Sequence, residues 1–177
     1  EVITIEEQDV DEELLWNLME KALTIAIEKL ISTRTTEGEL LKKDIIQKLD
    51  TINNLVSNIK TRAPYVIEEY KVKLENRIND LLSSTIDEAR LAVEVAIFAD
   101  KCCVDEEIVR LESHIEHMRR TLDKDIPIGR KLDFLLQEMN RESNTILSKS
   151  NDIEVSTNGL ELKTEIEKIR EQIQNIE

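Results

Sequence analysis

Apolar side chains that recur at alternating intervals of four and three residues are the feature that most limits how this chain can fold. Between residues 39 and 62 this spacing links Ile45, Leu49, Ile52, Val56 and Ile59. It places the side chains along one side of an α-helix and is typical of helices that pack against one another. With 3 glycines, 2 prolines and 3% aromatic residues, the chain also has few turn formers and little of a strand-rich composition. We therefore expect an all-α protein.

The first half of the chain is expected to form long helices. Asp11 is a suitable N-cap, and residues 32–38 are either a break or a strained stretch within one long helix. Trp16 is expected to pack on a neighbouring helix. Pro64 should end a helix, because the residue before a proline avoids helical geometry, and the helices on either side should then fold back as an antiparallel hairpin.

The middle and the second half of the chain carry further helical patterns. A turn is expected at residues 83–85, and the very apolar segment 86–100 is expected to be the most deeply buried. Residues 150–158 are polar and should form a loop. Three further helices are expected, each with an apolar side that packs on its neighbours. The apolar side of the first is Ile108, Leu111, Ile115, Met118 and Leu122, and that of the second is Leu132, Leu135, Leu136, Met139 and Ile146. The apolar side of the third is Leu162, Ile166, Ile169, Ile173 and Ile176.

These patterns predict one or more long antiparallel helical hairpins followed by a C-terminal three-helix bundle. The expected divisions are a lead-in segment at residues 1–10, a hairpin region at 11–100 and a C-terminal helical domain at 101–177 that carries the candidate site.

The charge of the chain limits the partners that it can bind. The formal net charge is −14, from 38 acidic and 24 basic residues, and this argues against binding nucleic acid over the whole surface. Between His117 and Lys131, however, bases outnumber acids, which leaves room for a local basic patch.

The two cysteines and the hydropathy indicate the compartment. Cys102 and Cys103 are adjacent, so no disulfide framework is expected, and they fit a reducing cytoplasm. No apolar run approaches the length of about 18 residues needed for a membrane span, and no signal peptide is evident.

Two polar faces carry the chemistry that the sequence offers. The first is Glu107, Arg110, His114 and His117, spaced by three and four residues on one helix. It is either an ion-paired, solvated face or a site in which His114 is a general acid, a general base or a metal ligand with a carboxylate partner.

The second face belongs to the helix expected at 129–150. Glu138 and Glu142, one turn apart, could hold a divalent cation, while Arg130, Arg141 and Lys149 could hold phosphates. The alternative is a salt-bridge network with a neighbouring helix. Uncharged donors and acceptors lie between these charges: Gln137, Asn140, Asn144, Thr145 and Ser148. Three residues of the last helix could face the same groove: Lys163, Glu167 and Arg170. Aromatic platforms for stacking bases are not expected.

Most of residues 100–177, and more loosely the helices before them, resemble the YicC/YloC family of bacterial proteins. The resemblance rests on Glu106–His114, on Pro127–Thr145 with the Ser148-Lys149 that follows, and on the terminal segment Glu167–Glu177. Arg34, Glu37 and Gly38 also resemble a family motif, whereas Cys103 stands where the family pattern has an aspartate. The family's proteins are longer, so the chain is expected to correspond to their C-terminal portion.

The resemblance implies an endoribonuclease that uses a divalent metal cation, Mg²⁺ or Mn²⁺, and that takes part in small-RNA turnover and stress responses as a cytoplasmic homo-oligomer, a hexamer at full length. The clustering of polar side chains and the resemblance together motivate the hypothesis that the catalytic residues are His114, Glu107, Glu138 and Glu142, with Glu138, Glu142 and His114 as metal ligands. The same hypothesis takes as RNA-binding residues Arg110, Arg130, Lys131, Arg141, Asn144 and Lys149. Two alternatives remain: a helical oligomerisation module, and an RNA-binding module without catalysis.

Overall fold

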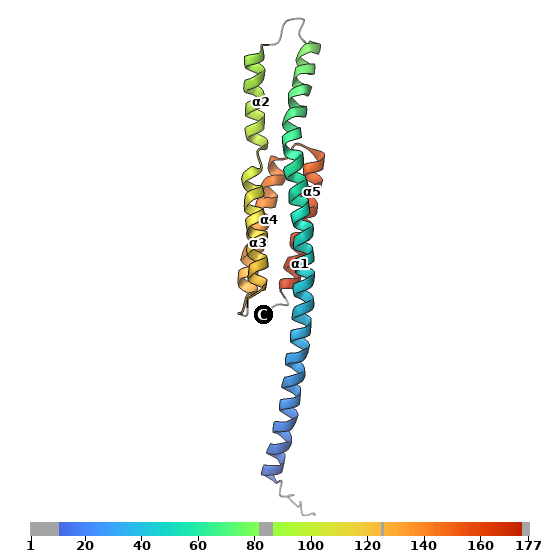
Figure 1. The fold of residues 1–177 in the computed structure, drawn as a ribbon, viewed down its shortest axis with the longest axis vertical. Helices are drawn as coiled ribbons and strands as arrows, with labels where there is room; N and C mark the ends of the chain where they lie inside the picture. The colour runs from blue at the N-terminus through green and yellow to red at the C-terminus, as the bar shows by residue number, and fades with distance from the viewer. Residues whose placement is uncertain (1–10, 82–86, 125, 175–177) are drawn as a thin grey trace, which may run out of the picture. The chain divides into compact units, whose positions relative to one another are not determined.

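The computed structural model describes residues 11–81, 87–124 and 126–174, and every regular element in these ranges is an α-helix. The helices are α1 (Glu12–Leu81), α2 (Glu88–Cys102), α3 (Asp105–Leu122), α4 (Gly129–Lys149) and α5 (Ile153–Ile173), as Figure 1 shows. The predicted all-α class is confirmed. The lead-in segment, the predicted turn at 83–85 and Ile176 lie outside the described residues. Among the described helices, none is both long and apolar enough to cross a membrane.

The chain divides into two units, residues 1–41 and 42–177. In the first unit α1 is continuous through residues 32–38, so the alternative of one long helix is correct. The expectation for Trp16 is wrong within this chain, because its side chain is 67% exposed. Other large apolar side chains of this unit are exposed as well: Leu14, Leu15, Leu18, Met19, Leu23, Ile25, Ile27, Leu30, Ile31 and Leu40. The predicted domain limits stay a prediction.

In the second unit, α1 from Lys42 onward packs with α3, α4 and α5 around one hydrophobic core. Lys60 pairs with Glu112 and Asp50 with Arg119, so α3 runs antiparallel to α1. The core contains all five residues of the α1 pattern together with the described apolar sets of the other helices: Ile45, Leu49, Ile52, Val56, Ile59, Ile108, Leu111, Ile115, Met118, Leu122, Leu132, Leu135, Leu136, Met139, Ile146, Leu162, Ile166, Ile169 and Ile173.

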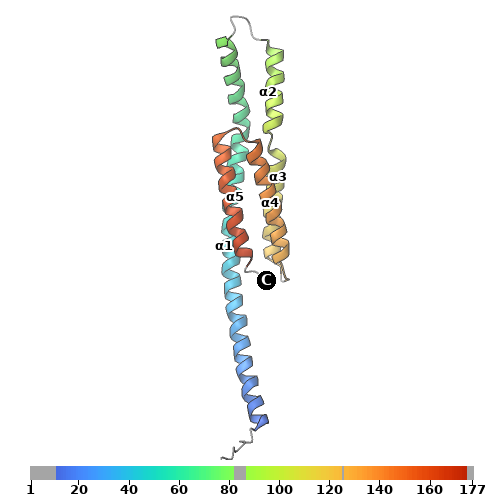
Figure 2. The ribbon, with the colours of Figure 1, turned by 180° about the vertical axis from the view of Figure 1, so that it is seen from behind.

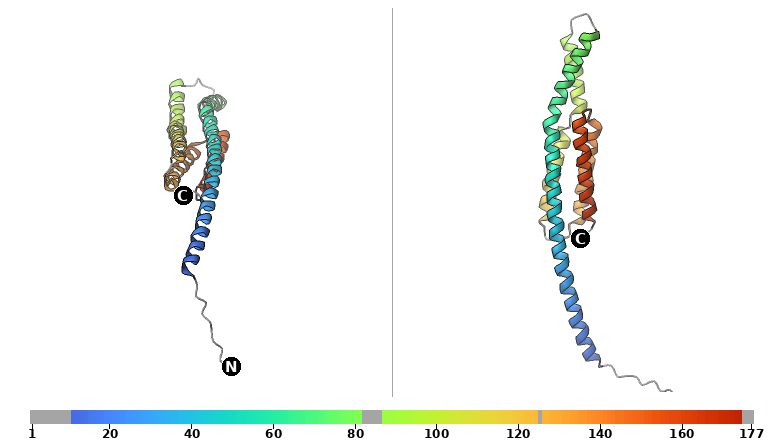
Figure 3. Two further views of the ribbon diagram at one scale, coloured as in Figure 1. Left: turned by 60° about the horizontal axis from the view of Figure 1, so that its bottom comes forward. Right: turned by 90° about the vertical axis from the view of Figure 1, so that its right-hand side faces the viewer.

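The last helix, α5, also runs antiparallel to α1. Asn58 bonds to Asn158 near the beginning of α5, and Asp44 accepts a hydrogen bond from Gln172 near its end. Figures 2 and 3 show α5 alongside α1, and Figure 2 shows α4 between α5 and α3. The predicted three-helix bundle is therefore completed by α1 as a fourth helix.

The prediction that Pro64 ends a helix is wrong, because α1 continues through it to Leu81. An internal proline costs roughly 3 kcal/mol, since one backbone hydrogen bond is lost. Packing on both sides offsets this cost: Ile59 is fully buried, and Ala63 and Val66 pack against the core. The helix that folds back antiparallel to α1 is α2. The chain therefore reverses its direction after the end of α1 at Leu81, and not at Pro64.

The segment 86–100 is less buried than predicted. Of its described residues only Leu91 is buried, and Val93 and Ile97 are exposed. Figure 1 shows α2 beside the C-terminal part of α1, and the Tyr70 and Phe98 rings stack with their centroids 3.6 Å apart. A helix that packs on one neighbour buries one stripe only, so high apolar content alone does not bury the rest.

The predicted loop at 150–158 is also wrong, because α5 begins at Ile153. Asp152 caps this helix by accepting a hydrogen bond from the Val155 N–H at 2.9 Å, and Val155 is buried. Polar composition suggested a loop, but one capping aspartate and one apolar anchor are enough to start the helix.

Gly159 of α5 lies in close contact with the Leu147 side chain of α4. An added Cβ would lie 2.8 Å from Leu147 Cδ2 and 3.1 Å from its Cγ, whereas at Gly38 it would meet nothing within 4 Å. Gly159→Val is therefore expected to lower the free energy of unfolding by about 1–3 kcal/mol. Gly38→Val is the matched control and should change it by less than about 0.5 kcal/mol. Thermal unfolding measures both, and equal effects would contradict the prediction.

Arg62 joins α1 to the turn between α4 and α5. Its Nη2 donates to Asp152 Oδ2 at 2.8 Å, and its two terminal nitrogens donate to the Glu69 carboxylate at 2.6 and 2.8 Å. The bond from Arg62, and secondarily the Val155 N–H, hold the pKa of the Asp152 carboxyl below its ordinary value of 3.8. The Arg62 bond lowers the pKa of Glu69 as well.

Arg62→Met is expected to lower stability near neutral pH, and the difference from the unchanged protein should shrink once the pH falls below 3.8. A carboxyl with a lowered pKa in the folded state contributes stability above its unfolded pKa, and this contribution is lost as pH falls through the folded pKa. Urea unfolding at neutral and acid pH measures the effect. Arg77→Met, at an exposed position of the same helix, is the control, and a pH-independent gap for Arg62→Met would refute the interpretation.

Candidate functional site

Two ion pairs connect α3 to α4 along one side of the bundle. Lys149 Nζ lies 2.8 Å from Glu107 Oε1 and donates to the Cys103 carbonyl at 3.0 Å. Arg110 donates to Glu142 Oε1 at 3.2 Å. The hydrogen bond that Lys149 donates to Glu107 is the main cause of the raised pKa of Lys149, and the bond that Arg110 donates to Glu142 is the main cause of the raised pKa of Arg110. The predicted salt-bridge network between helices is thus present for these four residues.

The two carboxylates of these pairs are buried, with Glu107 5% and Glu142 4% exposed. Burial of a charge is costly unless a partner compensates it, so each base stabilises the acid beneath it. Arg110 remains half-exposed and also bonds to Glu106. Glu107 and Glu142 are therefore placed to position their partners and are shielded from a large ligand, whereas Arg110 is accessible.

His114 and Glu138 are one helical turn beyond the Arg110–Glu142 pair, each on its own helix. Because α3 and α4 are antiparallel neighbours, this step of four residues on each helix places His114 and Glu138 in the same layer of the interface. Both are partly exposed, and in the described part of the chain neither makes a hydrogen bond or an ion pair. They are therefore the predicted catalytic residues whose side chains are accessible and have no bonding partner among the described residues.

The next turn of α3 carries His117 in a basic environment. Partial burial lowers the pKa of His117, and the nearby charges of Lys131 and Lys124 lower it further. Lys131 is exposed at the start of α4. Of the bases predicted to form a patch between residues 117 and 131, Arg119 and Arg120 are paired with Asp50 and Glu116. Lys124 and Lys131 lie near His117, whose lowered pKa favours the neutral imidazole.

The three predicted metal ligands do not gather into a metal site within this chain. In the described residues no group of three or more His, Cys, Asp and Glu side chains is placed to hold a metal ion. Glu142 is engaged by Arg110, which leaves Glu138 and His114. The residues present thus do not fit a metal held by Glu138, Glu142 and His114 together.

The outward face of α4 is a separate surface. Arg130, Gln137, Arg141 and Ser148 are exposed there, and a shallow depression is lined by Gln137, Asn140, Arg141, Asn144, Thr145 and Ser148. Arg130, Lys131 and Arg141 have no acidic partner among the described residues. These three cations, together with the depression, are called the α4 cationic face below.

Helix α5 borders the α4 cationic face. Lys163 Nζ donates to Asn144 Oδ1 at 2.9 Å, and Arg170 lies 4.0 Å from Asp133, which also accepts from Gln137 at 2.7 Å. Of the three α5 residues predicted to lie beside this face, Lys163 and Arg170 contact α4 side chains, and Glu167 lies 3.6 Å from Arg170. The depression itself is lined by α4 alone, so Lys163, Glu167 and Arg170 do not line it together with the α4 residues.

One residue of this face was not expected from the sequence. Phe134 is 59% exposed on α4, although the neighbouring Leu132, Leu135 and Leu136 are buried. Its position two residues after Leu132 takes it off the apolar stripe, and this spacing was the signal that would have found it.

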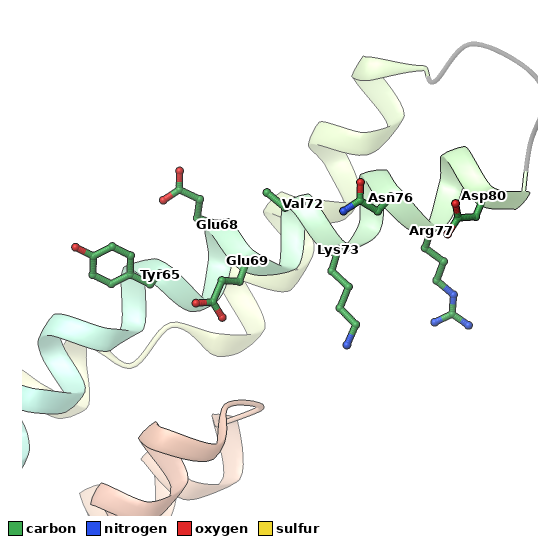
Figure 4. A pocket seen from close by; sticks show the side chains of 8 residues that line it. All are labelled: Tyr65, Glu68, Glu69, Val72, Lys73, Asn76, Arg77 and Asp80. Carbon is green, nitrogen blue, oxygen red and sulfur yellow. The ribbon is translucent and has the colours of Figure 1, made fainter.

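A second depression lies along the C-terminal part of α1 and is lined by residues of that helix alone, among them Tyr65, Lys73 and Arg77. Figure 4 shows that its side chains spread to different sides of the helix and do not converge on one point. None of the predicted site residues lies here. This surface is a useful control for experiments on the α4 cationic face.

Comparison with known proteins identifies the class to which this helical bundle belongs. Residues 59–177 match the family described as "Endoribonuclease YicC-like, C-terminal". The chain belongs to this YicC-like family, as the resemblance had indicated. All predicted site residues lie within the matched region.

Two relatives carry the same name. The chain is 50% identical over 179 residues to the "Probable endoribonuclease YicC" of Clostridioides difficile (strain 630), which covers 100% of this chain and 61% of the relative. It is 36% identical to the protein of that name from Haemophilus influenzae, over 99% of this chain and 60% of the relative. The chain therefore spans about three fifths of the length of these curated relatives.

Proposed function

We propose that this protein is an endoribonuclease, in which the α4 cationic face binds RNA and His114 assists cleavage of the phosphodiester bond. One observation carries the proposal: Arg130, Lys131 and Arg141 are exposed and lack acidic partners in the described part of a chain whose net charge is −14. Cations that the protein's own acids leave unpaired are the groups best suited to phosphates. The family and the names of both relatives support the activity.

His114 is proposed as the general acid or base. An imidazole can take the proton of the attacking hydroxyl or give a proton to the departing 5′ oxygen, and such transfers contribute about 10²–10⁴-fold to a rate. His114 is half-buried and follows Arg110 by one turn on the same face of α3, which would place its imidazole near a phosphate held by Arg110. Glu138, in the same layer, is proposed to orient the imidazole.

The remaining predicted residues have supporting roles in this proposal. Glu142 positions Arg110, and Glu107 positions Lys149, because each buried carboxylate bonds to its base. Asn144, held by Lys163, lies in the depression of the α4 cationic face as an additional RNA contact.

The divalent cation, Mg²⁺ or Mn²⁺, remains part of the proposal as a requirement to be tested. Magnesium is usually held by one or two carboxylates together with substrate phosphates and water, so a set of three protein ligands is not needed. Cleavage that is lost with EDTA and restored by Mg²⁺ or Mn²⁺ would support the requirement, and cleavage that persists in EDTA would refute it.

We further propose a cytoplasmic homo-oligomer, a hexamer at full length, with a role in small-RNA turnover under stress. The exposed apolar side chains of α1 between residues 14 and 40 favour self-association, because contiguous apolar surface commonly marks an interface. Light scattering on the protein as it elutes from a size-exclusion column measures its mass. A monomeric mass at every protein concentration would count against the oligomer.

RNA cleavage is the test of the main proposal. A labelled RNA is incubated with this chain and, in parallel, with the full-length relative from Clostridioides difficile, because the chain spans 61% of that relative. Defined internal cuts by both support an endoribonuclease in which this region is sufficient. Binding without cleavage by either protein, over several RNAs and metals, would instead favour the RNA-binding alternative.

The double variant Arg130→Gln, Arg141→Gln tests the binding surface. Its affinity for RNA should fall, and the slope of log K against log salt should decrease by about 1.4, since each lost single-strand phosphate contact contributes about 0.7. The double variant Lys73→Gln, Arg77→Gln removes the same charge from the depression on α1. Equal losses for both double variants would show that net charge, and not the α4 cationic face, governs binding.

A further inference from the structure

Phe134 is an exposed aromatic side chain whose placement the core does not explain. It is 59% exposed, while the other phenylalanine of the chain, Phe98, stacks on Tyr70. The buried side of α4 is complete without it, since Leu132, Leu136 and other apolar residues fill that side. Leaving a phenylalanine in water forgoes the stabilisation that burial would supply.

The neighbours of Phe134 are the cations of the α4 cationic face. Arg130 precedes it by four residues and Arg141 follows it by seven, so all three project from the same outward side of the helix. Gln137, three residues after Phe134, is exposed there as well. At a rise of 1.5 Å per residue the two arginines are about 16 Å apart along the helix axis, with the phenyl ring between them.

We propose that Phe134 is a stacking platform for one unpaired nucleobase of RNA, with Arg130 and Arg141 bound to phosphates on either side of it. This inference rests on the proposed function and adds the residue that contacts the base. A phenyl ring offers a flat apolar face to any base, and flanking guanidinium groups neutralise the backbone that carries the base. The combination is suited to a nucleic acid strand more than to an apolar partner surface, which would bring no charge for the two arginines.

The platform has a consequence for the RNA that binds. A base within a duplex is already stacked between its neighbours, so its face is not available to Phe134. An unpaired base presents its face at little cost. The platform therefore favours unpaired segments and tolerates different base identities, because every base has such a face.

The first experiment measures binding of a short fluorescein-labelled 2′-O-methyl oligoadenylate, which lacks the free 2′-hydroxyl, and of its duplex with oligouridylate. Phe134→Ala is expected to weaken binding of the single strand about 5- to 150-fold, the range that corresponds to one stacked base. Phe134→Trp should retain binding. Leu160→Ala, at a leucine that is also 59% exposed but lies on α5, is the matched control and should leave affinity unchanged.

The second experiment observes the stacking directly. In a protein with Trp16→Phe, the variant Phe134→Trp carries a single tryptophan, at the proposed platform. Its fluorescence should be quenched by the oligoadenylate and not by the same chain length of abasic sugar-phosphate. Equal quenching by both strands would overturn stacking.

The outcomes separate this inference from the proposed function. If Arg130→Gln with Arg141→Gln weakens RNA binding but Phe134→Ala does not, the platform is wrong and the RNA-binding face stands. If the unchanged protein neither binds nor cleaves RNA, the proposed function is refuted, and the platform that rests on it is refuted as well. If Phe134→Ala alters the mass in light scattering and leaves RNA affinity intact, Phe134 belongs to a contact between protein chains, and the inference is refuted.

Discussion

Replacement of His114 by alanine is expected to lower the rate of RNA cleavage about 10²–10⁴-fold, the contribution of a general acid or base. The side chain is half-buried between α3 and α4 and makes no hydrogen bond or ion pair in the described part of the chain. Its removal should therefore affect chemistry far more than folding. Single-turnover cleavage, with thermal unfolding as the check on folding, measures both.

The control for this prediction is His117→Ala on the same helix. His117 is more exposed and lies beside Lys131 and Lys124, in surroundings that lower its pKa. Its loss should alter RNA affinity more than the cleavage step. If His114→Ala cleaves at the unchanged rate, the imidazole is not the proton carrier; if both variants lose the same large factor, the effect cannot be assigned to His114.

Leu136→Ala is expected to give the largest loss of stability among the single changes considered, about 2–5 kcal/mol. Leu136 is 1% exposed in the core between α4 and its neighbours, so its removal leaves a cavity in addition to losing apolar burial. Urea unfolding should show a lower midpoint with a similar slope.

Leu160→Ala is the matched comparison, because this leucine belongs to α5 and is 59% exposed. Its free energy of unfolding should change by less than about 0.5 kcal/mol. Equal losses for the two variants would mean that the core does not lie where the structure places it.

The helices were predictable from the sequence, and so were the Asp11 cap of α1 and the limits of α4, but the continuation of α1 through Pro64 and the start of α5 were not. The buried sides of α3, α4 and α5 follow the three-and-four spacing closely, and this spacing depends only on helix geometry. Pro64 and the start of α5 were missed because tertiary contacts decided them: Arg62 and Val66 stabilise the helix around the proline, and Asp152 begins α5.

The candidate site shows a similar limit. The sequence indicated which faces of α3 and α4 are polar, yet it could not show that Glu107 pairs with Lys149 and Glu142 with Arg110. Such pairs depend on the register between two helices that are separated along the chain. Phe134 escaped notice for a different reason: the spacing shows that it leaves the apolar stripe, but only exposure shows that nothing else covers it.

The contribution of α1 to the core determines where the protein can be cut. The family match begins at residue 59, which lies inside α1, but Ile45, Leu49, Ile52 and Val56 are buried and precede that boundary. A fragment that contained only the matched residues would lose the part of the hydrophobic core that α1 supplies before residue 59. The apolar sides of α3 and α5 would then be exposed to water. We therefore expect the boundaries drawn from family similarity to differ from those that permit folding, and we expect a folded site to need the longer segment from Lys42 onward.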